Sequence, residues 1–274
     1  MSKKPLRFYY GWVIIAVSFL TIFLSLGTRV SFGVFYVAIL GEFGWGRAET
    51  AGAFSLALVC HAIFAPVTGT FIDRIGPRRL FPLGAILLFL GLLAASRINN
   101  IWHLYLIFGV MAIGINIISV APHMSIVHRW FIRKKGLAIG LMMSGVGLGG
   151  LVLVPFSELM IETFSWRWAF IILSGIILCI LLPLTAIFHR SYPTDVGQYP
   201  DGIVPEKDDS LNLHSERDAV SPEAQRSWSF ASAIRVKSFW SLELAIMCEG
   251  LIMSMLWVHL AVFIVDVGYS KMFA

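Results

Sequence analysis

The sequence of residues 12–37 is WVIIAVSFLTIFLSLGTRVSFGVFYV, an almost unbroken apolar run. Arg29 is its only charged residue. A helix needs about 20 predominantly apolar residues to cross the hydrocarbon core of a bilayer. The apolar part of a cleaved signal peptide is about 7–15 residues long, and no small-residue cleavage site follows this stretch. The stretch therefore predicts a retained transmembrane helix.

Six more apolar runs of similar length follow along the chain. They cover residues 48–71, 79–96, 101–127, 136–161, 168–189 and 239–265. Of the 274 residues, 58% are hydrophobic and 14% are charged, whereas about 25% are charged in a typical soluble domain. Because so few charges do not cover a water-facing surface, a soluble enzyme, a secreted disulfide scaffold and a disordered chain are excluded. The sequence predicts an all-α integral membrane protein.

The basic residues of the loops indicate the orientation. Ten of them lie on one predicted side of the membrane: Lys3, Lys4, Arg7, Arg74, Arg78, Arg79, Arg129, Arg133, Lys134 and Lys135. The other side has three, Arg47, Arg97 and Arg167. Cytoplasmic loops carry the excess of lysine and arginine in membrane proteins. We therefore expect a cytoplasmic N-terminus in a plasma or inner membrane.

The composition changes after the sixth run. Residues 191–229 are rich in Asp, Glu, Ser and Pro, which is typical of a polar linker. The expected organisation is a six-helix bundle over residues 1–190, a cytoplasmic linker with an interfacial segment over 191–237, and a seventh helix within 238–274.

The seventh run resembles the first. Trp12 and Trp240 are 228 positions apart, and the segments 30–35 and 258–263 share that offset. Parallel repeats of six helices are one recurring plan of membrane transporters. The pattern predicts that the seventh helix opens a second bundle, and that the rest of this C-terminal half is missing from the chain.

A charged turn separates the second and third runs. Residues 69–79 are GTFIDRIGPRR. This resembles the loop motif of the major facilitator superfamily, G-x-x-x-D-R-x-G-x-R-[RK]. The resemblance implies a gate that opens and closes on the cytoplasmic side, formed by Gly69, Asp73, Arg74, Gly76 and Arg78. The alternative is a structural turn whose positive charges only fix the orientation.

A second signature follows the fourth run. Residues 130–140 are WFIRKKGLAIG, and the chain opens its first run with YYGW at residues 9–12. Both resemble the monocarboxylate transporters and the related oxalate/formate exchangers. The resemblance implies a secondary transporter of small organic anions, monocarboxylates or related carboxylates. It implies alternating access, coupled to protons or working by exchange. The family's arginine on helix 8 lies beyond this chain.

Small residues recur every four positions in the fifth run, which is typical of closely packed membrane helices. They form two rows, one of Gly136, Gly140 and Ser144 and one of Gly145 and Gly149. We expect both rows to pack against neighbouring helices.

Arg29 is the first candidate for substrate binding. A central arginine costs at least ~2.5–3.5 kcal/mol on insertion scales, so it is expected to face a cavity or a partner. Residues 21, 25, 29 and 33 recur on one face and predict a polar stripe that lines this cavity. The alternative is an arginine that extends to the outer interface. Asn116 and Tyr36 complete the predicted binding set.

Glu249 lies near the middle of the seventh run and is the candidate proton carrier. The alternative is a neutral, hydrogen-bonded acid with a packing role. His61 is more typical of a packed histidine than of a ligand. The sequence has no nucleotide-binding, nucleophile or metal-ligand spacing. We expect no cofactor, no metal and no nucleic acid, but lipid and a small organic anion as partners. A drug or sugar carrier, and a remnant that does not transport, are the alternative functions.

Overall fold

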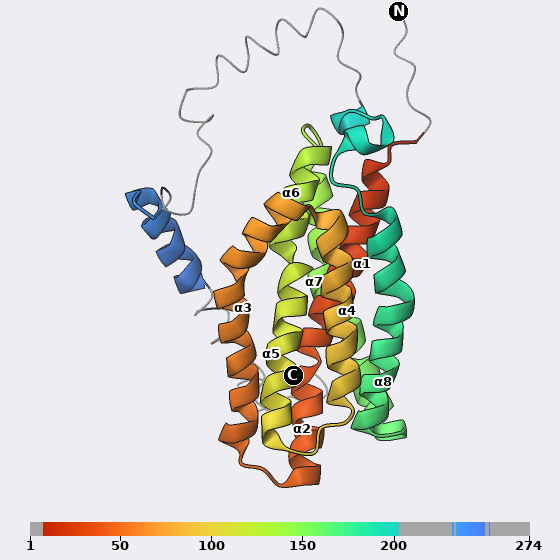
Figure 1. The fold of residues 1–274 in the computed structure, drawn as a ribbon, viewed down its shortest axis with the longest axis vertical. Helices are drawn as coiled ribbons and strands as arrows, with labels where there is room; N and C mark the ends of the chain where they lie inside the picture. Colours follow the sequence, from red (N-terminus) through yellow and green to blue (C-terminus); the bar gives the residue numbers. More distant parts are fainter. Residues whose placement is uncertain (1–7, 203–231, 233, 250–251, 253–274) are drawn as a thin grey trace, which may run out of the picture. The chain divides into compact units, whose positions relative to one another are not determined.

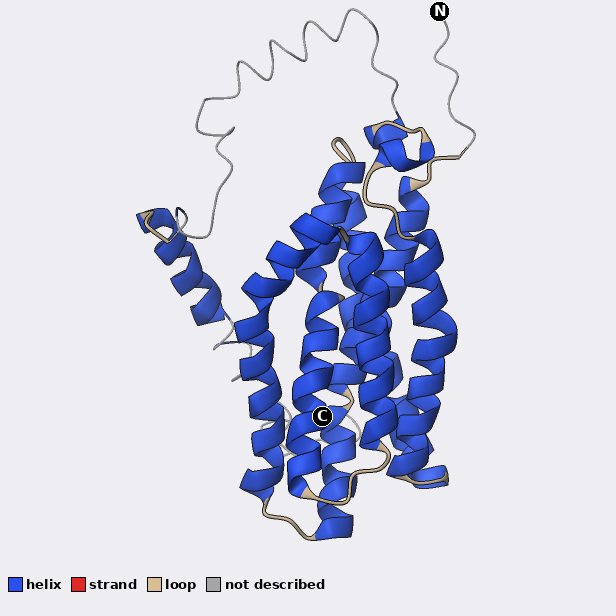
Figure 2. Ribbon diagram, viewed as in Figure 1, coloured by secondary structure: helices blue, strands red, loops and turns tan. Residues whose placement is uncertain are grey.

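The computed structural model describes residues 8–202, 232, 234–249 and 252 (Figure 1). The chain divides into two compact units, Met1–Pro205 and Glu206–Ala274, and each is described by itself. Throughout the described residues, every regular element is a helix (Figure 2).

The first unit contains six helical spans that are long and apolar enough to cross a membrane, counted over the described residues. They are Gly11–Phe43, Arg47–Ile75, Pro77–Ala95, Ile101–Trp130, Lys135–Thr163 and Trp166–Phe188. These spans match the first six predicted runs and confirm the predicted all-α membrane fold. In the second unit residues 237–249 are helical, whereas the predicted seventh run beyond them, except residue 252, lies outside the described residues.

Two of the six spans are interrupted. The first consists of α1 (Gly11–Val30) and α2 (Phe32–Phe43), and the fourth of α5 (Ile101–Ile117) and α6 (Val120–Trp130). The continuous spans are α3 (Arg47–Ile75), α4 (Pro77–Ala95) and α7 (Lys135–Thr163). The sixth begins as α8 (Trp166–Ile176) and continues through the π-helical turns η1 (Ile177–Leu181) and η2 (Leu184–Phe188).

Local side-chain chemistry sets several helix ends. The side chains of Asn100 and Ser165 accept hydrogen bonds from the backbone N–H groups of Trp102 and Trp168, which caps the start of α5 and α8. Gly76 separates α3 from α4 with a φ of 86°, a backbone conformation that favours glycine, and Pro77 then begins α4. The charged turn is therefore sharp because of its glycine and proline.

The most extensive helix contact joins α1 and α7, and both α3 and α4 pack against α5. Glycine allows α1 and α7 to approach: a Cβ placed on Gly145 would lie 2.7 Å from the carbonyl oxygen of Phe19, and one on Gly27 would lie 2.6 Å from that of Gly149. The row of Gly145 and Gly149 therefore contacts α1.

The other small-residue row of α7 has different surroundings. A Cβ on Gly136 or Gly140 would meet no atom within 4 Å, and both glycines are exposed, as is Ser144. The first unit therefore provides no described helix against this row.

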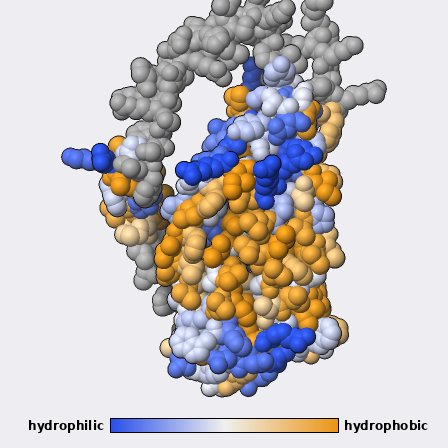
Figure 3. All heavy atoms as spheres, in the orientation of Figure 1, coloured by the Kyte–Doolittle hydropathy of each residue, from blue (hydrophilic) through white to orange (hydrophobic). Residues whose placement is uncertain are grey.

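The surface of the first unit agrees with a membrane environment. On the face shown in Figure 3, apolar side chains form a band across the middle of the helices, and charged side chains gather at both ends. Large apolar side chains of α3 are exposed, among them Val59, Ile63 and Val67. We call the end that carries Tyr9, the α3–α4 turn and the α6–α7 loop the basic end, and the other end the opposite end.

The segment after the sixth span packs onto the basic end. It contains the 3-10 turns η3 (Pro193–Val196) and η4 (Pro200–Gly202). The Asp201 carboxylate accepts hydrogen bonds from the backbone N–H groups of Ile132 (3.0 Å) and Arg133 (2.7 Å) in the α6–α7 loop. Residues 191–202, which the composition places in the linker, are thus an ordered part of the first unit.

Two side chains join this segment to the start of the chain. The Gln198 amide donates to the carbonyl oxygen of Phe8 and accepts from the N–H of Tyr10, both at 3.0 Å. The Tyr9 hydroxyl donates to the carbonyl oxygen of Trp130 and accepts from the N–H of Asp201. Burial raises the pKa of Tyr9 to about 12, so the hydroxyl stays protonated and donates this hydrogen bond at neutral pH.

Candidate functional site

Arg29 lies in the last turn of α1, two residues before the interruption at Ser31. The hydroxyl groups of Thr28 and Ser31 donate to the carbonyl oxygens of Leu24 (2.7 Å) and Gly27 (2.9 Å) on the preceding turn. Such local bonds bend helices. The hydroxyl-bearing residues around Arg29 therefore account for the interruption beside the charged side chain.

The Arg29 side chain lines a cavity of about 40 Å³. The cavity walls come from α1, α2, α3, α4, α5 and α8 and are mainly aromatic and aliphatic. The lining residues are Thr28, Arg29, Phe32, Phe35, Phe54, Ala57, Leu58, His61, Leu92, Phe108, Met111, Ala112, Ile115 and Phe170. This volume holds only a few water molecules.

The predicted polar stripe reaches this cavity at one position. Thr21 and Ser25 are fully buried, and their hydroxyl groups donate to carbonyl oxygens of α1 itself. A Cβ placed on Gly33 would meet no atom within 4 Å. Residues four positions apart are offset by about 40° around the helix axis, so the stripe winds around the helix. Of its four residues, Arg29 is the one that lines the cavity.

Asn116 lies in the last turn of α5, before the second interruption at Ile118 and Ser119. It is 2% exposed, and its side-chain amide donates to the backbone carbonyl oxygen of His61 at 2.7 Å. With His61 and Asp73 it lines a second cavity of about 310 Å³. The structure thus brings Asn116 beside His61, in the cavity next to that of Arg29.

Tyr36 is positioned elsewhere. Its hydroxyl donates to the carbonyl oxygen of Arg47 at 3.0 Å. Its side chain lines a separate, open cavity of about 570 Å³ between the C-terminal half of α2 and the start of α3. The described structure does not bring Tyr36 and Arg29 into one cavity.

The charged turn lies at the basic end. Asp73 is 4.0 Å from Arg129 of α6, and the Asp73 side chain is 76% exposed. Exposed ion pairs at this distance contribute about 0–1 kcal/mol. Arg74 and Arg78 are exposed, and a Cβ on Gly69 would meet no atom within 4 Å. The turn is therefore open to a further contact on this side of the first unit.

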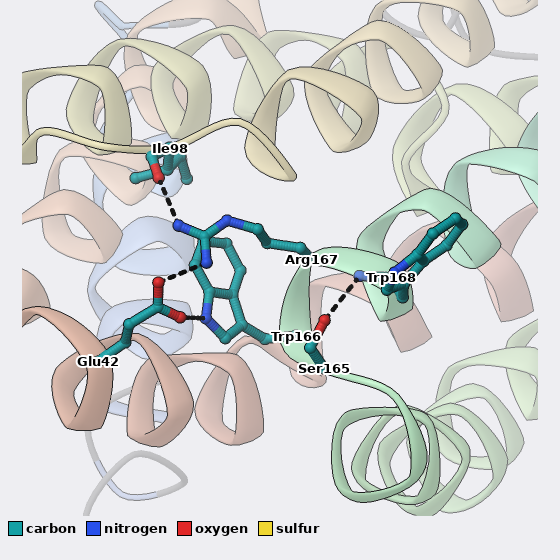
Figure 4. Close-up of polar contacts among 6 residues, drawn as sticks. All are labelled: Glu42, Ile98, Ser165, Trp166, Arg167 and Trp168. Carbon is teal, nitrogen blue, oxygen red and sulfur yellow. Dashed lines mark hydrogen bonds and ion pairs between the residues drawn. The ribbon is translucent and has the colours of Figure 1, made fainter.

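Sequence reasoning missed a polar cluster at the opposite end (Figure 4). The Glu42 carboxylate on α2 accepts hydrogen bonds from the indole N–H of Trp166 (2.5 Å) and from the guanidinium of Arg167. Arg167 also donates to the carbonyl oxygen of Ile98 and lies 4.2 Å from the centre of the Trp166 ring. The cluster joins α2, α8 and the α4–α5 loop. No local pattern signals it, because Glu42 and Arg167 are 125 positions apart.

Two histidines are buried near the basic end. The rings of His123 and His189 both pack against Phe81, with ring centres 4.4 and 4.5 Å from it. His123 Nδ1 contacts the carbonyl oxygen of Ser119 at 2.8 Å. Both ring nitrogens of His189 lack a hydrogen-bond partner among the described residues. The cluster belongs to the packing of α4, α6 and the end of the sixth span.

Glu249 is an exposed residue of the helix at residues 237–249 in the second unit. Glu249 is not among the lining residues of the Arg29 cavity or of the Asn116 cavity.

The profile of the Major Facilitator Superfamily matches residues 17–274. The chain belongs to this superfamily. The match confirms the resemblance that the turn at residues 69–79 indicated.

Several similar proteins are monocarboxylate transporters, as the sequence signatures implied. Monocarboxylate transporter 9 of Rattus norvegicus is 30% identical over 211 residues, 76% of this chain and 41% of that protein. Monocarboxylate transporter 13 of Bos taurus is 30% identical over 167 residues, 61% of this chain and 39% of that protein. Monocarboxylate transporter 12 of Homo sapiens is 32% identical over 178 residues, 65% of this chain and 34% of that protein. The aligned region thus spans about two fifths or less of these relatives.

Proposed function

We propose that the protein, in its full natural length, carries small organic anions across a membrane by alternating access. The substrates are monocarboxylates or related carboxylates. One observation carries this proposal: the Arg29 guanidinium lines an otherwise largely apolar cavity and makes no ion pair or hydrogen bond with the described residues. The names of the similar transporters support the same substrate class.

The chemistry of Arg29 favours an anion. A charge in apolar surroundings is costly unless a partner neutralises it. A guanidinium offers two parallel N–H donors that match the two oxygens of a carboxylate. Interrupted helices at mid-membrane depth mark substrate sites in secondary transporters, and both interrupted spans carry a candidate residue beside the break.

The remaining assignments follow from the same proposal. The basic end faces the cytoplasm. The turn containing Asp73 and Arg74 forms part of the gate on that side, where its exposed charges are available to a second bundle. Coupling is to protons or to a counter-anion, and Glu249 is the candidate proton carrier of the second unit.

Uptake by purified protein in proteoliposomes tests the proposal. The protein is expressed from its complete reading frame, and a panel of radiolabelled lactate, pyruvate, oxalate and succinate is compared with empty vesicles. Arg29→Ala is expected to abolish carboxylate uptake while membrane insertion is retained, and Arg29→Lys is expected to keep part of it, because the charge remains. Near-normal uptake by Arg29→Ala would contradict the assignment of Arg29. Uptake of sugars or hydrophobic cations instead of carboxylates would contradict the substrate class.

A further inference from the structure

His61 brings a second ionisable group to the Arg29 cavity. α3 contributes the imidazole and α1 the guanidinium. The other polar side chain of the lining is Thr28, whose hydroxyl donates to the carbonyl oxygen of Leu24. No acidic residue is among the described residues that line this cavity.

Both groups have unused hydrogen-bonding capacity. The Nε2 atom of His61 is buried and has no hydrogen-bond partner among the described residues. The Arg29 guanidinium likewise has none. A buried polar group without a partner costs about 1–3 kcal/mol, and nearly all such groups in native proteins are satisfied by protein, water or a ligand. The buried His61 nitrogen and the half-buried, unpaired Arg29 guanidinium at one cavity indicate a place for a ligand that accepts hydrogen bonds.

The charges that can act on the imidazole are few. His61 lines two cavities, the one with Arg29 and the one with Asn116. The other ionisable residues that line these cavities are Arg29 of α1 and Asp73 of α3. Asp73 is twelve residues further along α3, about 18 Å at 1.5 Å per residue. The lining residues of α2, α4, α5, α6 and α8 carry no ionisable group. Arg29 therefore dominates the electrostatics at His61.

We propose that His61 is the proton carrier of a proton–carboxylate symport, and that it takes up a proton when a carboxylate binds against Arg29. This inference rests on the proposed function. Among the coupling modes of that function it takes proton coupling, and it assigns the residue that holds the proton.

The charge balance explains the order of events. In the empty cavity the guanidinium carries +1, and an imidazolium beside it would add a second positive charge in apolar surroundings, where like charges repel strongly. A bound carboxylate brings −1 and removes this repulsion. The imidazole then takes a proton from water, which forms a second ring N–H bond. The charged ring donates a hydrogen bond to the carboxylate.

The loaded cavity has the same total charge as the empty one, because one anion and one proton enter together. On the other side of the membrane the carboxylate leaves, repulsion from Arg29 returns, and the proton transfers back to water. The cycle carries one carboxylate and one proton in the same direction and moves no net charge. No oxidation or reduction is involved.

The experiment compares two transport modes in proteoliposomes that contain the full-length protein. The probe is whichever anion of the lactate, pyruvate, oxalate and succinate panel gives the fastest uptake. Accumulation is measured with an alkaline interior, and counterflow is measured at equal pH with the same anion on both sides. The variants are His61→Gln, which keeps an N–H donor but holds no extra proton, and His103→Gln, an exposed histidine outside the cavity.

The unmodified protein and His103→Gln should accumulate the anion about 10-fold for each pH unit, the ratio that a one-to-one symport gives. An imposed membrane potential should not change that ratio. His61→Gln should lose accumulation, with an internal-to-external ratio near one. Its counterflow should fall by no more than about 10-fold, which corresponds to one altered hydrogen bond.

Failure of the inference and failure of the proposed function give different results. Carboxylate uptake without a response to the pH gradient, or accumulation that survives in His61→Gln, would overturn the inference and leave the proposed function standing. Accumulation lost in Glu249→Gln but kept in His61→Gln would also overturn it, and would assign the proton to the second unit. No carboxylate uptake by the unmodified protein would contradict the proposed function, and the inference with it.

Discussion

Replacing Gly145 with alanine should weaken the contact between α1 and α7. The added Cβ would lie 2.7 Å from the carbonyl oxygen of Phe19, whereas real Cβ contacts begin at 3.0 Å and ordinary ones at 3.4 Å. The two helices must therefore separate by about 0.3–0.7 Å. Overpacking of this kind costs about 1–3 kcal/mol.

Gly175→Ala is the matched control. Gly175 lies in α8, and a Cβ there would meet no atom within 4 Å. Alanine stabilises a helix by roughly 0.5–1 kcal/mol relative to glycine, and both variants gain this contribution. The difference in the free energy of unfolding between the variants is then the overpacking cost alone, about 1–3 kcal/mol.

Thermal unfolding in detergent, followed by tryptophan fluorescence, measures this difference. One kcal/mol shifts Tm by about 2–4 °C in a domain of this size. We expect Gly145→Ala to unfold about 2–12 °C below Gly175→Ala. Equal Tm values for the two variants would refute the close approach of α1 and α7.

Two further predictions concern the basic end, and a third concerns the orientation of the chain in the membrane. Asp201→Ala removes the acceptor of the Ile132 and Arg133 N–H groups, and hydrogen bonds to a charged group contribute about 1.5–3 kcal/mol. Trypsin should therefore cut the α6–α7 loop about 10-fold faster or more. Asp195→Ala, which loses only bonds within its own segment, is the control, and an equal rate in both variants would contradict the role of Asp201. Burial, with His123 and Arg190 nearby, lowers the pKa of His189 well below its ordinary value. The folded state therefore holds the neutral ring, and stability should fall as the pH decreases below about 6.5, where unfolded histidine takes up a proton. A Tm series from pH 7.5 to 5 should show this fall and a shallower one in His189→Gln, whereas identical slopes would exclude His189 as the cause. A cysteine replacing Ser221, with Cys60, Cys179 and Cys248 changed to serine, should react with impermeant reagents only from the cytoplasmic side. Labelling in intact cells would reverse the proposed orientation.

The sequence was sufficient to predict the six spans, because each is a long apolar run and a bilayer requires such length. It did not predict the interruptions. The break at Ser31 depends on hydroxyl groups bonding to the preceding turn, and many membrane helices contain such residues without a break. The polar composition of residues 191–202 predicts a linker, yet Asp201 and Gln198 attach them to the first unit. Composition does not indicate where an acceptor meets a free N–H group.

The candidate site was predictable in part for a similar reason. Arg29 stands out because a lone charge in an apolar run is rare. Tyr36 and Arg29 share one span, but the chain carries Tyr36 past the break to a different cavity. The sequence around His61 is typical of an ordinary packed histidine, and only its place in the wall of the Arg29 cavity distinguishes it. The two small-residue rows of α7 have the same spacing, and the position of α1 alone decides which row is in contact.

The Glu42 cluster has a mechanical consequence for the first unit (Figure 4). It ties α2, α8 and the α4–α5 loop together at the opposite end, while Asp201 and Gln198 tie the chain start and the α6–α7 loop at the basic end. Both spans that are interrupted are therefore held near their two extremities. A helical span that is held at both ends bends most easily where the helix is interrupted. In these two spans the interruptions are at Ser31 and at the Ile118–Ser119 pair. Any flexing of the first unit during transport would then be concentrated beside Arg29 and Asn116, where a bound anion would experience it directly.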